Sequence, residues 1–168
     1  MATTYSGTVN VQILGQMLKT LDIGSARLDI NYSKRYTVAD GTGANQANMV
    51  WTDTRAIAAS GSDDLDLFGS LVNAFGDTIN FTAIKGIFIV AASANTNNLL
   101  IGGDGSAFVN WVANASDVLV VKPGGMIAVY DPSAGGYGVT NSSADVLQIN
   151  NSAGGTGVTY DIIIFGEV

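Results

Sequence analysis

Hydrophobic and polar residues alternate along much of the chain with the period of two that is typical of β-strands. The stretch 78–103 is the most informative. It begins with Ile79 and Phe81 on one side and becomes continuously apolar over 87–92. A polar break at 94–98 then precedes a second apolar run. We expect a strand that becomes buried on both faces, a turn, and a second strand that returns beside the first.

The same patterns predict strands elsewhere. They cover 7–14, 26–38, 49–57, 65–67, 118–121, 126–130, 145–150 and 158–165. We expect a bulge near Ser33 and Lys34. The sequence Lys122-Pro-Gly-Gly125 predicts a type II turn, because Pro followed by Gly suits the positive φ that such a turn needs at its second central residue. We expect 126–130 to return beside 118–121 as a hairpin.

Two segments carry a weak helical signal. Residues 15–22 are predicted as a turn or a single helical turn, because three apolar residues there have helical spacing. Residues 68–76 are the best helix candidate, because Leu67, Leu71 and Phe75 are four residues apart. That helix would have one or two turns.

About ten short strands without long helices predict an all-β, antiparallel β-sandwich of jelly-roll type. We expect one domain over 1–168, in which 1–21 is either an N-terminal arm or a simple edge strand. Because 158–165 also becomes fully apolar, it is predicted to lie beside 87–92 in one sheet. We expect something beyond the sandwich to cover the outer face of that sheet.

The composition makes several function classes improbable. Charged residues are only 12% of the chain, and seven basic against fourteen acidic residues give a net charge of −7. Nucleic-acid binding needs clustered basic residues, so we expect none. No apolar run is long enough for a membrane helix, and the N-terminus lacks the pattern of a signal peptide. We expect synthesis in a cytoplasm and no membrane partner.

Cysteine and histidine are both absent. Disulfides, thiolate metal sites and cysteine nucleophiles are therefore excluded. The commonest general base is also missing, and a serine nucleophile needs such a base. Glycine-rich stretches such as 151–157 lack the Lys-Ser/Thr sequence of a phosphate-binding loop. We predict no enzymatic activity and no cofactor.

Carboxylates are the weak candidates for a metal site. Asp63, Asp64 and Asp66 resemble a calcium-binding corner, but they lack the spacing of a full calcium loop, so a solvated turn is favoured. Asp53 and Arg55, two residues apart on one strand, are predicted to form a salt bridge within the strand or at a subunit contact.

Aromatic residues offer two interpretations. With asparagine-rich loops they could stack against sugars, and Tyr137 is the residue most expected to be exposed. Aromatic residues in β-sandwiches are more often core or interface anchors. The interface candidates are Phe88, Ile89, Trp51, Trp111 and Tyr137.

Two stretches carry a resemblance to known proteins. One runs from Tyr36-Thr-Val-Ala-Asp-Gly to Leu65-Asp-Leu67, and the other from Ala74-Phe-Gly-Asp-Thr-Ile to Gly86-Ile87, continued by Asn95-Thr-Asn-Asn98. With Pro123-Gly-Gly125 and the segment 158–166, they resemble small virion structural proteins of tailed bacteriophages and prophages.

The resemblance implies a virion component, most plausibly a capsid decoration (cement) protein on the capsid surface. Its partners would be the major capsid protein and further copies of itself, as a homodimer or homotrimer. The acidic charge suits the outside of the shell rather than contact with packaged DNA. The alternatives are a head-fibre, neck or tail module that binds host glycans, and a tail or neck component without such binding.

Overall fold

The computed structural model describes residues 4–168, so the first three residues of the predicted arm lie outside the described part of the chain. The all-β prediction is confirmed, with no helix in that part. Residues 4–168 contain fourteen strands rather than about ten. Three of the additional strands have only two or three residues, too few to show a period, and the fourth, 68–72, lies in the segment that was predicted as a helix. In chain order they are β1 (Gly7–Thr20), β2 (Ser25–Asp40), β3 (Gln46–Ala47), β4 (Met49–Ile57), β5 (Ser62–Asp66), β6 (Phe68–Val72), β7 (Thr78–Asn80), β8 (Ala83–Ala91), β9 (Leu99–Ile101), β10 (Leu119–Val121), β11 (Met126–Tyr130), β12 (Tyr137–Gly138), β13 (Val146–Asn151) and β14 (Val158–Glu167).

Two antiparallel sheets form a sandwich around the main core. One sheet has the order β11-β8-β14-β4, with β12 also paired to β8, and the other has the order β10-β9-β13-β5. The inward side chains of both sheets are almost fully buried and form one cluster, which includes Ile89, Ile101, Ile149 and Ile162. Their alternation with outward residues explains why period-two patterns predicted the fold class.

The two strands that become apolar on both faces are neighbours, as predicted. Strand β8 pairs with β14 from Tyr160 opposite Ala91 to Phe165 opposite Gly86. Both are central strands of the five-stranded sheet. The register places Phe88 opposite Ile163 on the outer face.

Consecutive strands mostly cross between the two sheets, which corrects two predicted hairpins. Strand β8 is followed by β9 in the opposite sheet, so the second half of 78–103 does not return beside the first. Strands β10 and β11 also belong to different sheets. The turn between them is confirmed, since Gly124 has a φ of 72° and Gly125 donates a hydrogen bond to the Lys122 carbonyl. A period-two pattern reports a strand but not the sheet that it joins.

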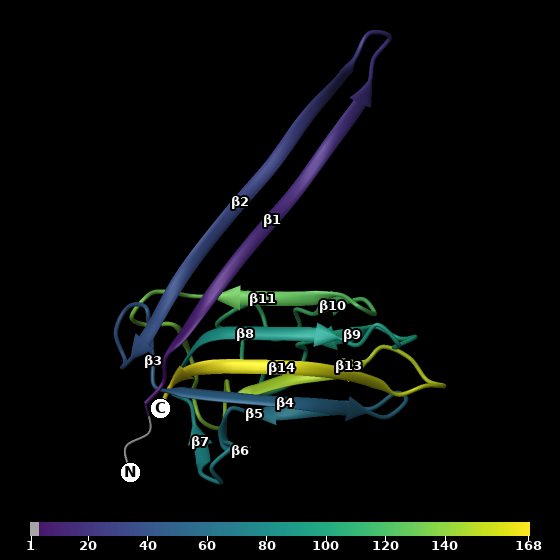
Figure 1. Cartoon of the computed structure of the whole chain (residues 1–168). Coiled ribbons are helices and arrows are strands. Elements are labelled where there is room, and N and C mark those ends of the chain that lie inside the picture. Colours follow the sequence, from purple (N-terminus) through teal and green to yellow (C-terminus); the bar gives the residue numbers. More distant parts are fainter. Residues whose placement is uncertain (1–3) are drawn as a thin grey trace.

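The long hairpin of β1 and β2 projects from the sandwich and is called the arm here (Figure 1). The two strands pair without interruption from Gly7 opposite Val38 to Thr20 opposite Ser25. The predicted turn at 15–22 and the predicted bulge at Ser33 are therefore both wrong. The reversal comes later, where Leu21 donates a hydrogen bond to the carbonyl of Gly24.

The predicted helix at 68–76 is also wrong, because β6 pairs with β7 there. Leu67 and Leu71 are buried, whereas Phe75 is 77% exposed, so the three residues do not share a face. Over residues 4–168 the structure contains no helix with the length and apolarity to cross a membrane.

Candidate functional site

The arm has one apolar and one polar face. Directly paired residues of an antiparallel ribbon lie on the same side of it. Val11, Ile13 and Met17 of β1 therefore share a face with Tyr32, Ile30 and Leu28 of β2, and these six residues are called the apolar face. All six are between 43% and 66% exposed. The opposite face is polar except for Leu14 and Leu18, and it carries Asn10, Gln12, Gln16, Asn31 and Arg35.

The base of the arm is anchored on the sandwich through a second hydrophobic cluster, called the joint. Buried residues from four segments form it, with aromatic rings packed around them. They are Val9, Val38, Ala47 and Phe165, with Tyr5, Tyr36, Phe88 and Tyr130.

Phe165 is the centre of the joint. Its ring stacks against Tyr5 at 5.8 Å and Phe88 at 6.0 Å between centroids, and it lies 6.0 Å from Tyr130. The ring lies over Gly86, where a Cβ atom would come within 2.3 Å of it. Gly86 is therefore required for the close approach of this ring to β8.

The arm covers only part of the outer face of the five-stranded sheet. Next to the joint, four apolar side chains of this face remain exposed by 37–63%. They are Val50 on β4, Ile163 on β14, Val90 on β8 and Met126 on β11, and are called the open face. The expectation that the outer face needs cover is thus met in part by the chain's own arm.

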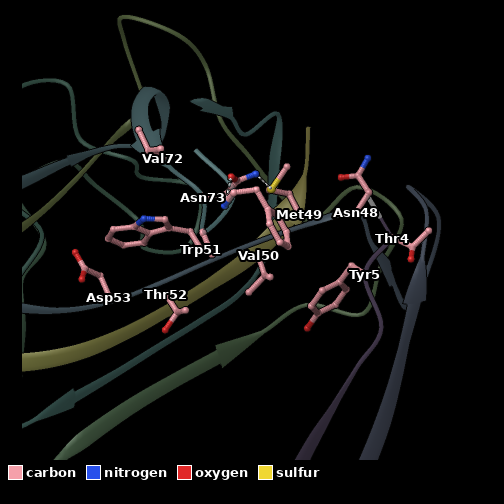
Figure 2. Close-up of a pocket in the computed structure, with 12 residues that line it drawn as sticks. Thr4, Tyr5, Asn48, Met49, Val50, Trp51, Thr52, Asp53, Val72 and Asn73 are labelled. Atoms are coloured by element: carbon pink, nitrogen blue, oxygen red, sulfur yellow. Dashed lines mark hydrogen bonds between the residues drawn. The ribbon is translucent and has the colours of Figure 1, made fainter. Parts of the chain in front are cut away.

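A pocket of about 450 Å³ lies between β4 and the turn after β6. Figure 2 shows Trp51 and Asp53 toward one end and Tyr5 and Thr4 toward the other, with Met49 and Asn73 between them. Among residues 4–168, Asp53 is the only carboxylate that lines it. Because the Trp51 side chain is largely buried, its ring serves the core rather than an exposed stacking surface.

The predicted pair of Asp53 and Arg55 is confirmed as a salt bridge, with 3.0 Å between carboxylate and guanidinium. Arg55 also pairs with Asp63 on β5, and the hydroxyl of Tyr160 donates a hydrogen bond to Asp63 at 2.8 Å. The arrangement ties β4 and β14 of one sheet to β5 of the other.

This network shifts the pKa values of its members. Burial opposes ionisation of Asp63, but hydrogen bonds from Arg55 and Tyr160 outweigh it and lower the pKa of the carboxyl group. The pKa of Arg55 is raised, chiefly by its hydrogen bond to Asp63. Burial and the same carboxylate raise the pKa of Tyr160. All three groups keep their usual charge at neutral pH, as expected of an ion pair and a hydrogen bond that stabilise the fold.

The three candidate calcium ligands do not converge. Asp63 is held by Arg55, Asp64 accepts a hydrogen bond from Gln148, and Asp66 accepts one from the backbone of Phe68. Their alternation along β5 directs Asp63 to the opposite side from Asp64 and Asp66. No group of three or more acidic side chains suited to a metal ion is found within residues 4–168.

The five interface candidates have different surroundings. Ile89 and Trp51 are buried in the main core, and Trp111 and Tyr137 pack against it. The indole of Trp111 donates a hydrogen bond to the Phe108 carbonyl. Only Phe88 lies on the outer face, where it is half-buried at the joint.

The sequence patterns predict both strands of the arm, 7–14 and 26–38, but not that they pair with each other. The signal was present, because both segments alternate and Gly24 lies between them at the turn. The pattern does not show that both strands are exposed, since alternation is as typical of a half-buried strand as of an exposed one. Comparisons of the chain with protein-family models, with curated proteins and with solved structures found no match.

Proposed function

We propose that this chain is a non-enzymatic structural protein of a bacteriophage virion that decorates the outside of the head. In this role it binds the lattice of the major capsid protein and stabilises the shell. The observation that carries the proposal is the amphipathic arm. A two-stranded ribbon is marginally stable alone in water, so an exposed apolar ribbon suits a protein that works within an assembly, on a lattice and beside further copies of itself.

Two further features support the location on the head. The net charge of −7 disfavours contact with packaged DNA and suits the outer surface of the shell. The resemblance of 36–67 and 74–87 to small virion proteins points to the same class. A cement protein needs no chemistry, only a stable body and surfaces that match a repeating lattice.

The test uses purified protein and undecorated phage heads. We expect the protein to co-sediment with the heads, to saturate at a fixed number of copies per head, and to raise the temperature at which they release DNA. Failure to bind, or binding that leaves heat resistance unchanged, would refute the cement role.

The position in the particle is tested separately by imaging virions that carry labelled protein. Label distributed over the head is expected. Label confined to the neck or tail would assign the chain to that structure instead.

A further inference from the structure

The apolar face of the arm is too long to be covered by its own sandwich. Beyond the joint, the exposed residues of β1 from Val11 to Lys19 extend about 30 Å, at about 3.3 Å per residue. In Figure 1 the arm diverges from the sheets toward its tip, so its outer part has no cover within the chain. Ile13 is 56% and Met17 66% exposed there.

The open face of the five-stranded sheet matches this ribbon in length and chemistry. The part of β14 that precedes Phe165 of the joint, residues 158–164, extends about 23 Å, as does the apolar face from Val11 to Met17. Met126 lies opposite Val90, and Ile163 lies opposite Phe88, so exposed apolar side chains from three strands adjoin one another. They continue directly into the joint, where the chain already accepts an apolar arm on this sheet.

Charge is divided unequally between arm and body. Residues 7–40 contain four of the seven basic residues and three acidic ones, which gives +1. The remaining three basic and eleven acidic residues give −8 for 41–168. Lys34 shares the side of the apolar face, opposite Val11, and Asp161 lies beside Val90 on the outer side of the sheet. The nearly neutral arm is therefore not repelled by the acidic body of another copy, as a second body would be.

The area suits a contact that depends on concentration. A two-stranded ribbon about 23 Å long and 10 Å wide has about 230 Å² on one face. If two copies exchange arms, both arm faces and both sheet faces are covered, so about 900 Å² is buried, the size of a weak, reversible interface. Contact between two arms alone would leave the open face exposed.

We propose that the apolar face of the arm packs on the open face of the five-stranded sheet of a second copy of this chain. The exchange is reciprocal in a pair or sequential in a closed ring. This self-association concerns the free protein and does not depend on binding to a capsid.

The first test measures mass in solution without heads, by sedimentation over a range of concentrations. Wild type is expected at twice the 17.3 kDa of the chain or a higher multiple. Ile13→Lys on the arm and Ile163→Lys on the sheet should each weaken association about thirtyfold or more, as for a hot-spot residue. Gln12→Lys, one residue away on the polar face, is the matched control and should associate like wild type.

The second test identifies which surfaces meet. Because the chain has no cysteine of its own, any disulfide must join introduced cysteines. Ile13→Cys and Ile163→Cys proteins are mixed and oxidised. A disulfide between the two different variants is expected. Disulfides only between two Ile13→Cys chains would show that arms meet arms and would overturn the proposal.

A monomer at all concentrations, or equal weakening by Gln12→Lys, would also overturn it. Circular dichroism of each variant keeps unfolding distinct from dissociation. A chain that associates as described but does not bind heads would refute the proposed function alone, whereas a monomer that binds heads would refute only this inference.

Discussion

Replacement of Phe165 by alanine tests the joint that holds the arm on the body. The ring is 3% exposed and contacts three other aromatic rings from the N-terminal segment, β8 and β11. It is the one fully packed side chain of β14 that faces the arm. Its removal therefore loosens the arm while the inward face of β14 is unchanged.

The size of the effect follows from the packing. Truncation of a buried phenylalanine to alanine costs about 3–5 kcal/mol, because transfer free energy is lost and a cavity remains. Aromatic pairs contribute about 0.5–1.5 kcal/mol each beyond burial, and three such pairs are lost here. Because the measured range for truncation already includes such contacts, the three pairs place the loss at its upper end, and we expect the free energy of unfolding to fall by about 5 kcal/mol.

Two measurements separate body from arm. Urea unfolding followed by tryptophan fluorescence reports the body, since Trp51 and Trp111 pack in and against the main core. Trypsin reports the arm, because Lys34 and Arg35 lie just above the joint. Cleavage at these two residues should accelerate in Phe165→Ala.

The control is Phe75→Ala. Its side chain is 77% exposed, so the loss should stay below about 0.5 kcal/mol with unchanged cleavage. If Phe165→Ala loses less than about 1 kcal/mol and its arm is cleaved at the wild-type rate, the joint does not hold the arm.

Three further predictions concern buried groups. Lys85, 1% exposed, pairs with Glu167 at 2.8 Å, so Lys85→Met should lower the free energy of unfolding in urea by about 3–5 kcal/mol. Adding Glu167→Gln should recover part of this loss, and a double variant whose loss equals the sum of the two single losses would contradict the pairing. Folding lowers the pKa of Asp63, so its carboxylate stabilises the fold above about pH 4, and this stabilisation is lost as pH falls through the folded-state pKa. In Asp63→Asn the free energy of unfolding should therefore fall less steeply with acidification than in wild type, and an unchanged slope would refute this role of Asp63. Folding raises the pKa of Tyr160, so its neutral hydroxyl stabilises the fold below about pH 10, and this stabilisation is lost as pH rises toward the folded-state pKa. In Tyr160→Phe the free energy of unfolding should fall less steeply at alkaline pH than in wild type, and an equally steep fall would count against this role of Tyr160.

Phe88 and Ile89 separate interface from core within one strand. They are adjacent on β8, so their side chains point to opposite faces. Ile89→Asp places a charge in the main core and should abolish folding, as judged by circular dichroism. Phe88→Asp should leave the β-sheet signal and weaken self-association. The reverse pattern would invert the assignment of the two faces.

Residue patterns along the chain are enough to predict the fold class and the position of most strands. Alternation in 49–57 and 145–150 marks strands because only one face of each meets the core. The doubly apolar β8 and β14 were recognised as neighbours because both need cover on two sides. The salt bridge of Asp53 and Arg55 also followed from local spacing.

Which sheet each strand joins, and which apolar faces remain uncovered, depends on contacts between distant parts of the chain. The turn at 122–125 has the chemistry of a hairpin, yet its strands lie in different sheets because partners are chosen by contacts distant in sequence. Likewise, 7–14 and 26–38 have the pattern of half-buried strands, although most of their apolar residues face solvent in the isolated chain. Period-two alternation records that one face of a strand is apolar, but the surface that covers this face is set by the rest of the fold or by a neighbouring molecule.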